Sequence, residues 1–197
     1  MSCRIVEQYL EASPPFDLRD RTAVREYHSK LEAARHLAEL HPLETGHCLS
    51  FHLTIPPANP LPNSRPLPHL PRHPSISFWL AQSLQCGPDK LSQVWTAGAE
   101  FPDSDAKTTV VLKMFQPSMG SYPDADSLWH HDYVFSEAYA RDEAWVYNLN
   151  RLEHKQGLSI PYFFGLHTII TPSNELAWVL VLEYIPGGTL RAYIASP

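Results

Sequence analysis

A stretch near the start of the chain has apolar residues at every third or fourth position, which is typical of an amphipathic helix. Its apolar positions are Val24, Tyr27, Leu31, Ala34 and Ala38. Asp20 precedes the stretch and is a preferred capping residue, whereas Pro42 disfavours a helical His41. The pattern predicts a helix that begins after Asp20 and ends near His41, in a region, residues 1–50, that we expect to be helical.

The second half of the chain alternates short apolar, β-branched runs with turn residues, which predicts strands. Five strands are expected, at residues 76–84, 91–97, 108–115, 162–170 and 176–184. The run Trp178–Leu182 contains no polar residue, so its strand is expected to be buried on both faces. Between the third and fourth strands, helical spacing predicts a helix over residues 132–156. The residues of this helix expected to face the sheet are Ala138, Trp145, Leu149 and Leu152.

This order of elements, β-β-β-α-β-β, predicts the α+β class. We expect a five-stranded antiparallel sheet with one main helix and an N-terminal helical extension. Residues 56–74 contain eight prolines, which exclude a helix or a central strand there and favour an extended linker. The predicted domains are a helical extension at 1–55, a proline-rich linker at 56–74 and the α+β unit at 75–197.

Composition and charge narrow the functional classes. Of 197 residues, 44% are apolar and 18% are charged, and the net charge is −6 without a basic stripe, which argues against nucleic acid as a partner. No apolar run approaches the length of a membrane span, and the first residues lack the apolar core of a signal peptide. Cys3, Cys48 and Cys86 form no C-x-x-C pair, and the histidines lack metal-ligand spacing. We expect an intracellular protein, cytoplasmic or nuclear, without a membrane partner.

Two segments carry candidate chemistry. The first, Val110-Val111-Leu112-Lys113, places a lysine inside a β-branched strand, where it is costly to bury unless it meets an anion. The second is the apolar run Trp178–Leu182, which leads into Glu183-Tyr184 and then into Pro186-Gly187-Gly188. Proline and glycine make that last segment irregular.

Together with the order of elements, these segments resemble the small lobe of the eukaryotic protein kinases, over about residues 75–197. Val110–Lys113 is similar to the V-A-I-K motif of the family, whose lysine contacts the α- and β-phosphates of ATP. The resemblance implies that Val111 lies at the nucleotide and that Lys113 pairs with a helix glutamate. Glu143 is the favoured partner because it lies in mid-helix, while Glu137 and Glu153 compete for the role.

The resemblance extends to a glycine-rich loop and a hinge. Gly87 and Val94 match the first glycine and the valine of G-x-G-x-x-G-x-V, but Asp89 and Ser92 replace the other two glycines. Asp89 also brings negative charge toward a polyanion.

At the end of the last strand, Leu182 falls at the family's gatekeeper position. In the family the hinge binds adenine through backbone groups, which implies roles for the Glu183 carbonyl and the Ile185 amide.

The catalytic motifs H-R-D and D-F-G of the family do not occur in this sequence. We therefore expect a truncated small lobe, at most weakly ATP-binding and inactive alone, with Mg²⁺ only if a catalytic lobe is supplied. The general character of the sequence is similar to that of divergent kinase-like proteins of fungi. Alternatives are a pseudokinase-type module that binds a protein partner through the exposed lobe interface, and a fragment of an aminoglycoside-phosphotransferase-like kinase.

Overall fold

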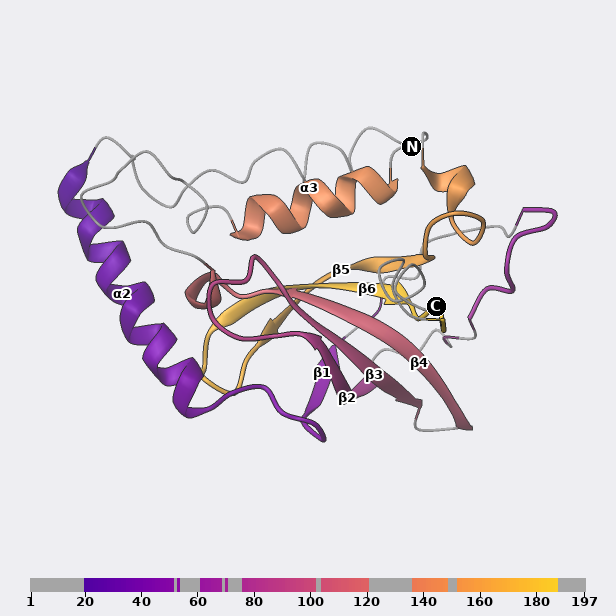
Figure 1. The fold of residues 1–197 in the computed structure, drawn as a ribbon, viewed down its shortest axis with the longest axis horizontal. Coiled ribbons are helices and arrows are strands. Elements are labelled where there is room, and N and C mark those ends of the chain that lie inside the picture. The colour runs from indigo at the N-terminus through magenta and orange to yellow at the C-terminus, as the bar shows by residue number, and fades with distance from the viewer. Residues whose placement is uncertain are drawn as a thin grey trace, which may run out of the picture.

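The computed structural model describes residues 20–51, 53, 61–68, 70, 76–101, 104–120, 136–148 and 152–187. In these residues, six strands form one antiparallel sheet and two α-helices pack beside it (Figure 1). The strands are β1 (Cys48–Phe51), β2 (Ile76–Gln85), β3 (Gln93–Phe101), β4 (Ser104–Phe115), β5 (Phe163–Ile170) and β6 (Leu176–Glu183). The helices are α2 (Arg21–Leu40) and α3 (Ser136–Asn148), with the 3-10 helices η1 (Pro117–Met119) and η2 (Glu153–Lys155). The α+β class is confirmed.

The sheet has the spatial order β1-β2-β3-β4-β6-β5 and is strongly curled. The curl brings the two edge strands together, so that the rings of Phe51 in β1 and His167 in β5 lie 5.1 Å apart, centroid to centroid. The inner face holds the larger apolar cluster, which includes Phe78, Leu112 and Val181. The sheet therefore encloses much of its own core on this face.

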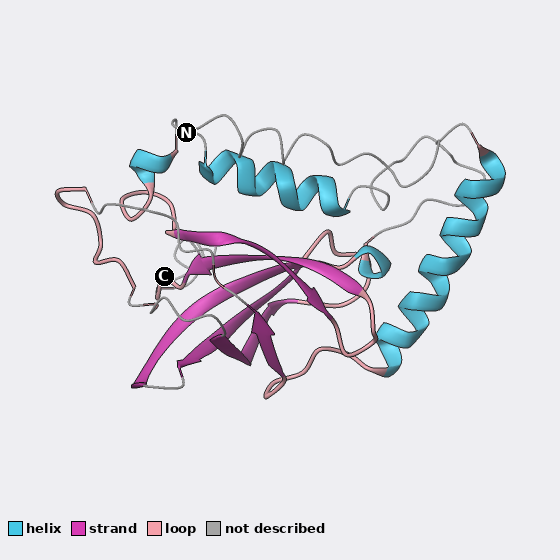
Figure 2. Ribbon diagram, turned by 180° about the vertical axis from the view of Figure 1, so that it is seen from behind, coloured by secondary structure: helices cyan, strands magenta, loops and turns pink. Residues whose placement is uncertain are grey.

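Helix α3 covers the other face of the sheet, where it contacts β4, β5 and β6 (Figure 1). Its Ala140 and Ala144 are fully buried in a second cluster with Phe115, Phe163 and Leu180. Two small residues four apart lie on one side of a helix and let its backbone approach the sheet closely. Figure 2 shows from behind that α2 stands across one end of the sheet while α3 runs along its face.

The predicted sheet-facing side of the second helix was wrong. Ala138 and Trp145 are only partly buried, whereas the fully buried residues are alanines, which apolar spacing does not single out. Leu149 lies outside the described residues. The predicted extension to residue 156 was also wrong, because α3 ends at Asn148 and Gln156 forms a bridge with Ile160. Gly157 then turns the chain with a φ of 75°.

The strand count was also wrong, because β1 lies in the region expected to be helical. Its four residues pair with the first strand expected from the sequence, with Leu49 opposite Phe78 and Phe51 opposite Ile76. The other five strands are confirmed, with ends shifted by a few residues. Helix α2 is confirmed too: the Asp20 carboxylate accepts from the backbone N–H groups of Thr22 and Ala23.

Part of the proline-rich segment packs against the sheet. Leu70 belongs to the inner apolar cluster, and Arg65 contacts the end of β6. The domain boundaries that the prolines suggested stay a prediction. Across the part of the chain that the structure describes, neither α-helix combines the length and apolarity needed to cross a lipid bilayer.

Candidate functional site

Lys113 and Glu143 form the central ion pair of the candidate site. Lys113 lies near the end of β4, and its Nζ donates to Oε2 of Glu143 on α3 over 2.5 Å. Both side chains are a little over a quarter exposed, at 27% and 28%. The ammonium also lies 5.3 Å from the ring centroid of Phe115. Both members of the pair are thus mostly buried but still reach solvent.

The competing glutamate Glu137 has a different partner. Its carboxylate accepts from the guanidinium of Arg141, one turn further along α3. The side chain of Glu153, the third candidate, lies outside what the structure describes. Glu143 is therefore the glutamate found beside Lys113.

The apolar candidates lie on the same face of the sheet as Lys113. Opposed residues of neighbouring strands share a face, and Lys113 stands opposite Val94 of β3. Val111 lies two residues before Lys113, on the same face, and stands opposite Leu182 of β6. Val94 and Val111 are partly exposed, whereas Leu182 is buried. The fold therefore brings together one cation and three apolar side chains from three strands.

Tyr147 of α3 extends this face. Its ring stacks on Phe163 with centroids 5.0 Å apart and an angle of 19° between the planes. Burial, and to a smaller degree the nearby Glu143 charge, raises the pKa of Tyr147 to about 12. The phenol therefore stays neutral at physiological pH.

The glycine loop between β2 and β3 is held by side chains. The amide of Gln93 accepts from the N–H of Gly87 at 2.8 Å and donates to its carbonyl at 2.9 Å. Gly87 and Asp89 have positive φ angles of 104° and 61°. Only glycine adopts such a conformation without strain, and aspartate is one of the few residues that tolerate it.

Helix α2 also holds this loop, which the sequence did not predict. Arg35 pairs with the Asp89 carboxylate at 3.2 Å, donates to the Ser118 carbonyl at 2.8 Å and contacts the Gly120 carbonyl. A positive charge thus lies beside the aspartate that was expected to repel a polyanion. Ser92, which replaces the third glycine, is buried.

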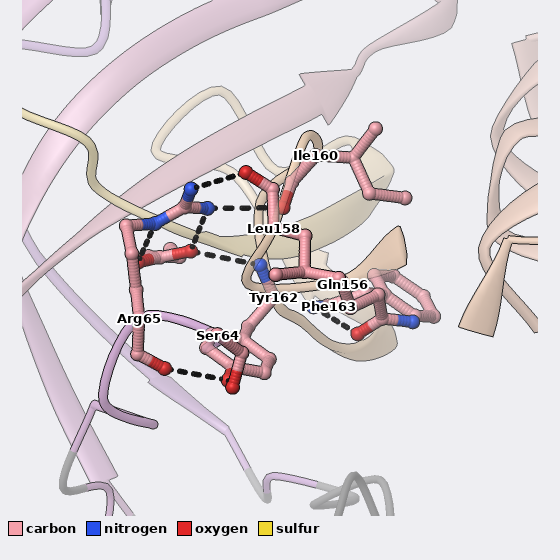
Figure 3. A network of polar contacts seen from close by, with 8 residues as sticks. Ser64, Arg65, Gln156, Leu158, Ile160, Tyr162 and Phe163 are labelled. Carbon is pink, nitrogen blue, oxygen red and sulfur yellow. Dashed lines mark hydrogen bonds and ion pairs between the residues drawn. The ribbon is translucent and has the colours of Figure 1, made fainter. Parts of the chain in front are cut away.

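The hinge candidates Glu183 and Ile185 differ in exposure. Ile185 is 42% exposed. Glu183 is buried at 7%, and its carboxylate accepts from Arg65 of the proline-rich segment and from the N–H of Tyr162 (Figure 3). Neither contact was predicted from the sequence. Arg65 is a single arginine among prolines, and such a segment has no periodic pattern that would indicate a partner.

A cavity of about 200 Å³ lies at the same end of the sheet, on the opposite face from Lys113. Gln93 and Trp95 line it, and Gln93 stands opposite Met114, the neighbour of Lys113 on the other side of the strand. Ala38 of helix α2 also lines it. Among the described residues, no group of three or more His, Cys, Asp or Glu side chains is arranged to hold a metal ion.

Comparison with protein-family models, with curated proteins and with solved structures found no match for this chain.

Proposed function

We propose that this chain is a protein-kinase-like small lobe whose α3-side face binds an adenine nucleotide. The observation that carries the proposal is the Lys113–Glu143 ion pair, formed across 30 positions of sequence between a strand and the following helix. In protein kinases the corresponding lysine–glutamate pair must be in place for phosphate binding. A pair of this kind, beside a row of apolar side chains, fits a ligand with an anionic tail and an aromatic ring.

The proposed roles follow the geometry of that face. Lys113 contacts the α- and β-phosphates, and Glu143 orients the ammonium toward them. Val94, Val111 and Leu182, which lie on one face of the sheet, provide apolar contact for one face of the base. The Glu183 carbonyl and the Ile185 amide then read the edge of the base, beyond the end of β6.

The proposal is confined to binding. Phosphoryl transfer needs a group that positions the acceptor and groups that hold Mg²⁺, and the sequence contains neither H-R-D nor D-F-G. The loss of two glycines from the loop weakens close approach of its backbone to phosphate. We therefore expect weak affinity for ATP, with Mg²⁺ bound only where a catalytic lobe supplies its ligands.

The test is titration of the purified chain with the non-hydrolysable ATP analogue AMP-PNP, with and without Mg²⁺. Lys113→Met is expected to weaken binding about ten- to a hundredfold, because it removes a charge-assisted contact. Lys107→Met is the matched control: this lysine lies on the same strand and pairs with Glu100 at 2.8 Å, but is 74% exposed. The control is expected to bind as the unchanged chain does.

Two results would contradict the proposal. One is the absence of saturable binding in a chain that circular dichroism shows to be folded. The other is an equal loss of affinity in the two lysine variants. Either result would favour the alternative, a module that binds a protein partner through the same face.

A further inference from the structure

Arg65 and Glu183 form a fork-to-fork pair at the end of β6. The Arg65 Nε donates to Oε1 of Glu183 and its Nη2 to Oε2, both at 2.9 Å (Figure 3). The two residues are 118 positions apart, and one comes from the proline-rich segment. Bidentate pairs of this kind fix direction as well as distance. The hydrogen bond to Glu183 is also the main reason that the pKa of Arg65 is raised.

The backbone around this pair is also held by hydrogen bonds. Arg65 Nη1 and Nη2 donate to the carbonyls of Leu158 and Ile160, at 3.1 and 3.0 Å. The N–H of Tyr162 donates to the Glu183 carboxylate at 3.0 Å, and the N–H of Glu183 donates to the Tyr162 carbonyl at 2.8 Å. The Tyr162 hydroxyl donates in turn to the Arg65 carbonyl at 2.7 Å. Glu183 is thus held through both its side chain and its backbone.

We infer that Arg65 is a positioning residue that sets the direction of the Glu183 carbonyl and so determines which purine base the hinge accepts. This inference rests on the proposed function. Glu183 is the last residue of β6, and the residues after it, Tyr184 and Ile185, are exposed. The backbone of Glu183 is thus held by its pairing with Val110 of β4 and by Tyr162, and Arg65 holds its side chain.

The chemistry of the base makes this role measurable. Adenine carries an amino group at position 6, which donates to a carbonyl, whereas hypoxanthine carries an oxygen there, which repels one. A correctly directed Glu183 carbonyl therefore favours ATP over ITP. Inorganic tripolyphosphate has no base, so its binding reports on Lys113 and not on the hinge.

The experiment measures the affinity of the full chain for ATP, ITP and tripolyphosphate by calorimetry. In the unchanged chain, we expect ATP to bind about tenfold more tightly than ITP, the effect of one hydrogen bond. In Arg65→Met the ratio should fall toward one, while tripolyphosphate affinity stays within about twofold. Arg65→Lys keeps the charge but not the fork, and should give an intermediate ratio.

Matched variants separate positioning from folding. Arg141→Met removes another arginine–glutamate pair, on α3, and should leave the ATP to ITP ratio unchanged. If Arg65→Met does not fold, Arg65→Lys and Glu183→Gln decide, and both should lower the ratio. A folded Arg65 variant that keeps the full ratio would overturn the inference, as would an equal loss of all three ligands. If the unchanged chain binds none of the three, the proposed function itself fails.

Discussion

At the scale of a single residue, the raised pKa of Tyr147 predicts how the stability of the folded chain depends on pH. Its folded-state pKa of about 12 lies above the ordinary tyrosine value of 10.0, chiefly because of burial. The folded state thus holds the phenolic proton more tightly than the unfolded state does. The resulting stabilisation is complete below about pH 10 and is lost as the pH rises from about 10 to about 12.

We therefore expect the free energy of unfolding to fall more steeply over this range in the unchanged chain than in Tyr147→Phe. Urea denaturation at successive pH values measures the difference. A difference titration of phenolate absorbance between the two chains should show one midpoint near pH 12. Glu143→Gln should lower that midpoint slightly, because the glutamate charge is the smaller cause. Identical pH dependence in the two chains would contradict the assignment.

At the residue scale, the contacts that could be predicted from the sequence are those whose two partners lie on a strand or a helix. Lys113 and Glu143 were paired in advance only because the lysine motif was compared with that of the kinases, and Glu143 was preferred because it was expected in mid-helix; the structure brings the two side chains together. Arg65 could not, because the hydrogen bonds that fix it come from the backbone of a turn and from Glu183. Nothing in the local pattern of a proline-rich segment indicates such a partner.

Helix α2 contributes at the scale of an element, through the hold of Arg35 on the glycine loop. A phosphate bound about 4 Å from the Asp89 carboxylate would be repelled by about 1 kcal/mol in water and by about 4 kcal/mol at intermediate dielectric. Arg35→Ala removes the neutralising charge. We expect it to weaken AMP-PNP binding about two- to tenfold at low salt.

A double-mutant cycle tests this coupling. In an Asp89→Gly background, Arg35→Ala should have a smaller effect, since no aspartate remains to be neutralised. Arg25→Ala, an exposed position on the same helix, serves as the control and should leave the affinity unchanged. Equal effects of Arg35→Ala in both backgrounds would show that the helix acts on the loop without the aspartate.

The sequence missed one strand and the buried side of one helix, for two different physical reasons. Strand β1 has four residues, too few for an alternating pattern to stand out after a long helix. Helix α3 buries Ala140 and Ala144, whose small size matters more than their hydrophobicity. The long strands β4 and β6 were predictable because runs of β-branched and apolar residues of that length favour strands.

For the whole molecule, closure of the curl by β1 is the decisive packing feature. Phe51 stacks on Phe78 with ring centroids 4.6 Å apart and is 8% exposed. Phe51→Ala should therefore lower the free energy of unfolding by about 3–5 kcal/mol, because it leaves a cavity between the edge strands. Leu84→Ala, at a site that is 53% exposed, should cost less than about 0.5 kcal/mol.

Urea denaturation followed by tryptophan fluorescence measures both variants. A cost for Phe51→Ala as small as that of the control would mean that β1 does not complete the sheet. The extent of the sheet was the part of the fold least accessible from sequence. Strand β1, which was not expected, forms through pairing with β2, whose residues lie far from it in the chain, and no local preference indicates it.

The position of β6 in the sheet has a consequence for folding during synthesis. Among the described strands it comes last in the sequence, yet it lies between β4 and β5. A chain that emerges from the ribosome with its N-terminal end first therefore exposes the unpaired edge of β4 until residue 183 has appeared. The open edge of such a β-branched, apolar strand presents unpaired backbone N–H and C=O groups that can pair with other chains. We therefore expect the nascent chain to be most prone to pairing with other chains in the interval before β6 is made.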